Sequence, residues 1–136
     1  MPISLSDAVL ALLREPSYAQ LATVMPDGSP QVTQVWIDHD GEHIIINTAV
    51  GHQKERNVRR DPRVAINVVD PNDQARQAAI RGRVVELTTA GAREQINTLA
   101  KKYMGVDEYP FGAPGETRIT LKIAPEHVSE LQGGDS

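Results

Sequence analysis

The chain has 136 residues, with 18 acidic and 14 basic side chains and a formal net charge of −4. This length fits one domain, which we expect over residues 1–132, with residues 133–136 as a disordered tail. The absence of cysteine excludes disulfides, thiolate metal sites and a cysteine nucleophile. The acidic balance disfavours nucleic-acid binding. No apolar run nears ~18 residues and no charged-then-apolar leader opens the chain, so we expect no membrane span and a cytoplasmic location.

The first third of the chain predicts one helix and two strands. Residues 4–15 form an amphipathic helical pattern, with Ser4 as the expected N-cap. Residues 18–25 are strand-like, and the Pro-Asp-Gly sequence at 26–28 is typical of a turn. Residues 30–38 alternate in polarity and predict the second strand.

The rest of the chain predicts four more strands and two more helices. A short basic helix follows the third strand and stops at Asp61-Pro62, and Gly82 indicates a bulge within a long strand. The remaining elements are expected as strands at 42–49, 63–69, 75–89 and 116–123, a helix at 90–104, and a Pro/Gly-rich loop at 105–115.

Six strands joined mostly by tight turns, with peripheral helices, favour a mainly β (α+β) fold. A six-stranded antiparallel barrel is the expected closure, because it removes exposed sheet edges. One Phe and one Trp leave the core to Val, Ile, Leu and Ala. A barrel this small often buries further apolar surface against a second copy, which suggests a homodimer.

The basic helix carries the strongest functional signal. Between His52 and Arg63, five basic and two acidic residues give a net charge of +3, which leaves −7 on the remainder. Lys54 stands at the start of this helix, where backbone N–H groups and the helix dipole favour an anion such as a phosphate. We expect Arg56, Arg59, Arg60 and Arg63 to be structural or peripheral. The alternative is that the whole segment is a solvated face of paired charges.

The strand from Gln31 to Trp36 carries neutral hydrogen-bonding side chains and a lone Trp. A half-buried strand of this kind must satisfy its polar groups, and a flat ring with polar edges would do so. The alternative for Trp36 is a core position, which is the usual one for a lone Trp in a strand. The loop at 105–115, with Tyr109 and Phe111, would either cover the site or merely connect two elements.

No catalytic side-chain constellation is evident in the sequence. The four histidines have no metal-type spacing, so we expect no metal site, and carboxylates are scattered rather than paired. Neither GxGxxG nor a Walker loop is present. A phosphate cradle beside a polar strand, without a catalytic residue, suits a protein whose cofactor performs the chemistry.

Three stretches together carry a family resemblance: LATVMPDGSPQVTQVWID, NTAVGHQKERNVRRDPRVAI and RQAAIRGRVVELT. They resemble the flavin-binding split β-barrel family typified by pyridoxamine 5′-phosphate oxidase. The resemblance covers residues 18–89 well and 116–128 more loosely. It implies a homodimer with two cofactor sites at the subunit interface and a small-molecule substrate.

The same resemblance implies which residues contact the cofactor. The ring would lie along the second strand and the end of the third, the phosphate at 52–54, and a residue of the long strand would reach the ring. The implied cofactor-binding residues are Gln31, Val32, Thr33, Gln34, Val35, Trp36, Asn47, Thr48, His52, Gln53, Lys54, Asn57 and Gln77.

The sequence departs from the flavin-dependent oxidase pattern, which has Arg and Lys at the positions of Gln31 and Trp36 and Ser-Arg-Lys at 52–54. Only Lys54 remains of those bases. The helix more closely resembles the K-x-R-N-[LV]-R-R-D-P-R pattern of the branch that uses the deazaflavin coenzyme F-420. The implied activity is hydride delivery from reduced F-420 to an unsaturated organic acceptor. The alternatives are an enzyme using flavin mononucleotide (FMN) and a non-catalytic cofactor-binding protein.

Overall fold

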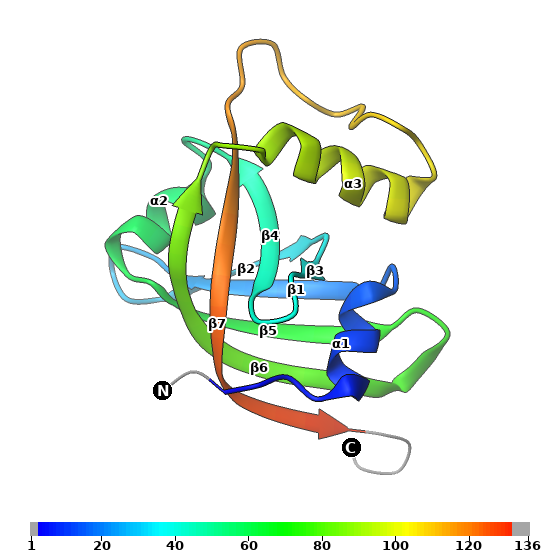
Figure 1. Cartoon of the computed structure of the whole chain (residues 1–136). Coiled ribbons are helices and arrows are strands. Elements are labelled where there is room, and N and C mark those ends of the chain that lie inside the picture. Colours follow the sequence, from blue (N-terminus) through cyan, green and yellow to red (C-terminus); the bar gives the residue numbers. More distant parts are fainter. Residues whose placement is uncertain (1–2, 132–136) are drawn as a thin grey trace.

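The structure, a computed structural model, describes residues 3–131. Seven strands form one antiparallel sheet in the order β2-β1-β5-β6-β7-β4-β3, with three helices around it in the described chain (Figure 1). The predicted mainly β architecture is confirmed, whereas the predicted tail at 133–136 lies outside the described residues. The elements are α1 (Asp7–Arg14), β1 (Tyr18–Val24), β2 (Pro30–Val35), β3 (Asp38–His39), β4 (Ile44–Ala49), α2 (Gln53–Arg60), β5 (Arg63–Asp70), β6 (Asp73–Thr88), α3 (Ala92–Met104) and β7 (Arg118–Leu131).

The expected count of six strands is wrong, because the strand predicted over 30–38 breaks in two. β2 ends at Val35, and the two-residue strand β3 then pairs with β4. The sheet is not closed by hydrogen bonds, since β2 and β3 are its two edge strands. Only Trp36 and Ile37 separate these edges along the chain. The sheet therefore curls until its two edges meet at this link.

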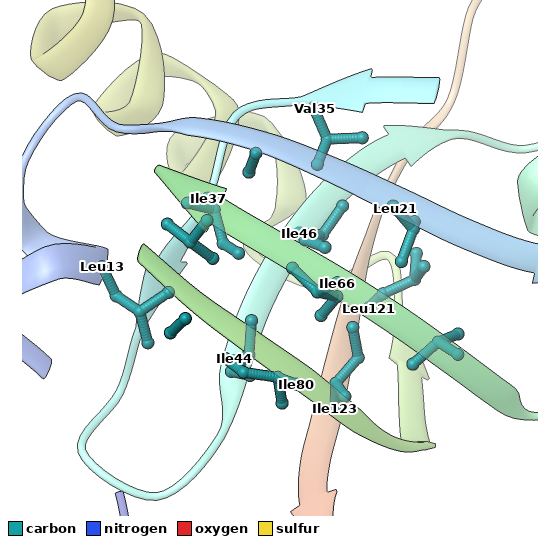
Figure 2. Close-up of a cluster of buried hydrophobic side chains, with 14 of the residues drawn as sticks. Leu13, Leu21, Val35, Ile37, Ile44, Ile46, Ile66, Ile80, Leu121 and Ile123 are labelled. Carbon is teal, nitrogen blue, oxygen red and sulfur yellow. The ribbon is translucent and has the colours of Figure 1, made fainter. Parts of the chain in front are cut away.

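Aliphatic side chains fill the inside of the curled sheet, as the composition predicts. Figure 2 shows them converging from strands on opposite sides of the barrel. The single Phe, Phe111, is 65% exposed and takes no part in the core. Fully buried members include Leu13, Leu21, Ile37, Ile44, Ile46, Ile80, Leu121 and Ile123.

Two element boundaries differ most from the sequence prediction. α1 begins at Asp7, and its N-cap is Ser6, whose hydroxyl accepts a hydrogen bond from the backbone N–H of Val9 at 3.2 Å. β7 continues to Leu131 through Pro125, well beyond the expected end at 123. Proline is tolerated there because the ladder with β6 shifts register at Gly82, the position where a bulge was predicted.

Glycine is required at position 82 by the packing of its neighbours and not by its backbone conformation. A Cβ at this position would lie 2.3 Å from the carbonyl oxygen of Ala124 on β7, an atom that cannot rotate away. Gly82→Ala should therefore push β6 and β7 apart and lower the free energy of unfolding by about 1–3 kcal/mol. Urea denaturation measures the change.

The matched control for this prediction is Gly112→Ala. Its new Cβ would meet only side-chain atoms, the nearest being Glu116 Oε1 at 3.2 Å. An equal loss of stability in the two variants would show that the close approach of β6 and β7 does not restrict position 82.

Candidate functional site

A cavity of about 360 Å³ opens where the ends of β2 and β4 meet the start of α2 and the start of β7. The long connection between α3 and β7, which runs above α3 in Figure 1, supplies two aromatic side chains to it. Its lining residues are Gln34, Val35, Trp36, Asn47, Thr48, His52, Lys54, Ile96, Tyr109, Phe111 and Arg118. Polar and aromatic groups from six parts of the chain thus converge on one hollow.

The N-terminus of α2 presents its first turn to this cavity. Its N-cap, His52, accepts no hydrogen bond from the helix through its side chain. The carboxylate of Glu55 turns back instead and accepts from the backbone N–H of Gly51 at 2.7 Å, which holds the entering loop. The first-turn N–H groups at 53–55 precede the point at which an α-helix pairs its own donors, and the N-cap side chain does not cap them. They are free to bind an anion, as expected of a helix N-terminus.

Lys54 is the one cation of α2 that lines the cavity. Its ammonium forms no ion pair within the described part of the chain. Burial, reinforced by the nearby positive charge of Arg118, lowers the pKa of Lys54 below its ordinary value. A half-buried lysine without a carboxylate partner is an electrostatic cost that a bound anion would offset.

The neighbouring arginines are engaged with other groups of the protein, in keeping with the expectation that they are structural or peripheral. Of the five basic residues between His52 and Arg63, Lys54 is the one that lines the cavity. Arg56 donates to the Gln53 side chain, Arg59 pairs with Glu55, Arg60 donates to the Val24 carbonyl, and Arg63 pairs with Asp61 at 2.7 Å.

Aromatic rings form one wall of the cavity. Trp36 stacks on Tyr103 with ring centroids 5.2 Å apart and planes 8° apart, and it meets the edge of Tyr109 at 5.8 Å. Tyr109 in turn meets the edge of Phe111. The connection after α3 is therefore part of the site, because its aromatic side chains line the hollow and do more than link two elements.

Asn47 lies between the cavity and α3. Its amide nitrogen donates to the carbonyl of Ala92 at 2.8 Å and to the side chain of Gln95 at 3.0 Å. Its Oδ1 accepts from Nε of Arg118 at 3.0 Å. Both amide hydrogens are thus used in holding α3 against β4, which leaves one oxygen lone pair for any ligand.

Four lining residues lie outside the predicted cofactor set: Arg118, Tyr109, Phe111 and Ile96. Tyr109 and Phe111 belong to the loop that the sequence suggested as a possible cover, whereas Arg118 and Ile96 were not proposed at all. Arg118 is only 8% exposed; its Nη1 donates to Glu116 at 3.0 Å, and its guanidinium lies 4.9 Å from the centre of the Tyr109 ring. If the predicted strand at 116–123 had been paired with the one at 42–49, Arg118 would have been expected near the basic helix. The sequence pattern alone does not reveal that pairing.

Seven of the thirteen predicted cofactor residues line the cavity: Gln34, Val35, Trp36, Asn47, Thr48, His52 and Lys54. The other six lie outside it. Val32 is 60% exposed and lines a second hollow on the outer face of the sheet. Gln77 lies in a crevice against α1. The roles of these residues toward a cofactor remain predictions.

The remaining predicted residues serve the interior or neighbouring side chains. Asn57 is fully buried and donates to Thr23 Oγ1 at 3.0 Å, so it joins α2 to β1. Gln31 accepts from the same hydroxyl at 3.4 Å, and the Gln53 side chain donates to Asn57 at 2.8 Å. Thr33 is half-buried on β2.

The described residues contain no group of three or more His, Asp or Glu side chains that could hold a metal ion. His39 accepts from the Gly41 N–H through Nδ1 at 2.9 Å, and its buried Nε2 has no partner within residues 3–131. Within the same range, no helix has both the length and the apolar character to cross a bilayer.

Comparison with known protein families shows which family the chain matches. The model of the family described as pyridoxamine 5′-phosphate oxidase matches residues 5–132, almost the whole chain. The chain belongs to this family. A pyridoxine/pyridoxamine 5′-phosphate oxidase from Rhodopseudomonas palustris (strain BisB5) is 31% identical over 126 residues, which is 91% of this chain. The chain spans only 59% of that relative's length.

Solved structures of other proteins share the fold. One, named F420 reductase, is 32% identical with a TM-score of 0.76 and covers 88% of this chain and 94% of its own. The HupZ protein of Group A Streptococcus has a TM-score of 0.66 at 23% identity, covering 97% of this chain and 98% of its own. The second likeness shows the fold alone.

Tyr103 holds the stacked wall in place. Its hydroxyl accepts from the backbone N–H of Ile37 at 3.2 Å and donates to the carbonyl of Ser17 at 2.7 Å. Tyr103→Phe leaves both buried backbone groups unpaired, so we expect about 1–3 kcal/mol less stability. Denaturation followed by the fluorescence of Trp36, the only Trp in the chain, measures this loss.

Tyr18→Phe provides the control, because Tyr18 is 56% exposed. It should change stability by no more than about 0.5 kcal/mol. Similar losses in both variants would mean that the Tyr103 hydroxyl does not hold the link between β2 and β3.

Proposed function

We propose that this chain is an oxidoreductase that uses reduced deazaflavin coenzyme F-420 to deliver a hydride to an unsaturated organic acceptor. The observation that carries the proposal is Lys54, a half-buried cation without a carboxylate partner, at a helix N-terminus beside an aromatic wall. A ring-bearing molecule with an anionic group has the chemistry that such a site recognises.

The residues of the cavity fit this cofactor class. Trp36 and the strand segment Gln34–Val35 offer a flat, partly polar wall to a ring, and Thr48 offers a hydroxyl to its edge. Lys54 and the first-turn N–H groups of α2 would hold a phosphoryl group. The bound cofactor would supply the transferable hydride, while the protein positions the acceptor within about 3–3.5 Å of the donor atom.

Two observations favour the deazaflavin over FMN. The solved structure named F420 reductase shares 32% identity with this chain. In addition, Gln31, Trp36, His52 and Gln53 replace residues of the flavin-dependent oxidase pattern, three of them bases. FMN is the second candidate, because the curated relatives are named pyridoxine/pyridoxamine 5′-phosphate oxidases.

We also propose a cytoplasmic homodimer with cofactor sites at the subunit interface. The outer face of the sheet supports it, since Tyr18 and Val32 are exposed there and a hollow of about 380 Å³ lies beside Val32. A partner on that face would also account for predicted cofactor residues outside the cavity of one chain. Sedimentation equilibrium tests this, and a monomer with full cofactor affinity would contradict it.

Titration of the purified protein with F-420 and with FMN, followed by fluorescence quenching, tests the cofactor choice. We expect F-420 to bind more tightly, and its reduced form to be oxidised under anaerobic conditions when a suitable acceptor is added. Tighter binding of FMN would reverse the order of the two candidates. Binding of F-420 without turnover across a panel of quinones, enones and imines would favour a carrier.

Lys54→Ala should weaken F-420 binding by about one to two decades, because a hydrogen-bonded contact to a charged group is worth on the order of 1.5–3 kcal/mol. The same titration measures it. Arg63→Ala removes an equal charge near the end of α2, at a side chain that is 67% exposed, and should leave affinity within twofold. A change below twofold for Lys54→Ala would place the phosphoryl group elsewhere.

Measuring the cofactor affinity of Lys54→Arg over a range of pH tests the role of the positive charge at position 54. The pKa of Lys54 is lowered by burial, so its positive charge should be lost at a lower pH than that of an exposed lysine. Affinity of the unsubstituted protein for the anionic cofactor should therefore fall as the pH rises, and at a lower pH than an ordinary lysine would require. An arginine stays charged there and should abolish that fall.

A further inference from the structure

Arg118 reaches the cavity because of strand register. In the ladder between β4 and β7, Arg118 lies opposite Ala49, the last residue of β4. The backbone N–H of Val50 then donates to the carbonyl of Thr117 at 2.9 Å, and α2 begins at Gln53. The start of β7 is thereby held beside the start of α2, and Arg118 and Lys54 line the same hollow.

The charges around this corner do not cancel. Arg118 and Glu116 form an ion pair of 3.0 Å in which both side chains are at most 10% exposed. Lys54 has no such partner within residues 3–131, and its pKa falls both through burial and through the charge of Arg118. Lys54, Arg118 and Glu116 give this corner two cations and one carboxylate, and Arg93 adds further positive charge near Glu116. In this partly desolvated place one further negative charge would be stabilised.

The guanidinium of Arg118 retains donors for a ligand. Nε is used by Asn47 and Nη1 by Glu116, and the ring face of Tyr109 lies against the group. Nη2 donates no hydrogen bond within the described chain. A guanidinium oriented by three neighbours loses little side-chain entropy when it binds an oxyanion.

We propose that Arg118 is a second cationic group of the anion site and, together with Lys54, binds the phosphoryl group of the ligand. This inference rests on the proposed function for the identity of the ligand, but the recognition it describes is that of any phosphate ester. The negative charge of Glu116 then limits how strongly the corner attracts an anion.

The two members of the Arg118–Glu116 pair give opposite expectations, which separates a binding role from a structural one. Arg118→Gln should weaken phosphate binding by about tenfold, because it removes a charge-assisted contact. Glu116→Gln should strengthen binding severalfold, because it removes a competing negative charge. Arg118→Lys keeps the charge and should retain more affinity than Arg118→Gln. Arg63→Gln serves as the exposed control.

The probe is inorganic phosphate, titrated against chloride at equal ionic strength and followed by NMR of ¹³C-methylated lysines. The chain has four lysines, so Lys54 can be assigned with Lys54→Arg. In the supporting outcome, the Lys54 signal responds to phosphate, Arg118→Gln raises the pKa of Lys54, and the two variants change affinity in opposite directions. If both variants weaken binding alike, or if the unsubstituted protein does not bind phosphate, the inference is overturned.

Parallel titrations with F-420 and FMN separate the two proposals. If neither cofactor binds but phosphate shows the opposed pattern, the redox assignment fails and the role of Arg118 stands. If either cofactor binds tightly and neither Arg118→Gln nor Glu116→Gln alters its affinity by more than twofold, the role of Arg118 fails and the redox assignment stands.

Discussion

The antiparallel pairing of β4 with β7 is the constraint on which the rest of the site depends. It places Arg118 opposite Ala49, and the chain reaches the first turn of α2 only four residues after Ala49. The same ladder carries Asn47, whose amide then holds α3 over the cavity. A one-residue slip would turn each of these side chains to the other face of the sheet. The core isoleucines on the same strands oppose such a slip, because it would expose them to water.

Trp36 joins the architecture of the sheet to the shape of the cavity. The two edge strands are consecutive in the chain, so the short link that contains Trp36 must bridge them. Ile37 points into the core with no exposed surface, while the Trp36 ring packs outward on Tyr103. Tyr103 is itself held by hydrogen bonds to Ile37 and Ser17. The wall is thus assembled from contacts within the chain itself, and such preorganisation reduces the ordering cost of binding.

What the sequence could predict was local. Alternating strands, turn residues, the basic helix and the Gly82 bulge all follow from neighbours a few positions apart, and the structure has them near the expected residues. The place of Arg118 in the site was missed because it depends on a contact with Asn47, which is 71 positions away. The hydrogen bond from the Asn47 side chain to the Ala92 carbonyl spans 45 positions. The break at Trp36 was missed because alternation continues through it, and only the curvature of the sheet ends the strand.

The titratable groups of the cavity suit binding better than proton transfer. Burial raises the pKa of Tyr103 to about 12, and its hydroxyl proton is already committed to the Ser17 carbonyl. The carboxylate of Glu116 is bound to Arg118, which lowers its pKa against the effect of burial and keeps it ionised. Lys54 forms no hydrogen bond or ion pair with a carboxylate among residues 3–131. These groups therefore hold charge rather than exchange it, which suits the corner to recognising an anion more than to moving a proton.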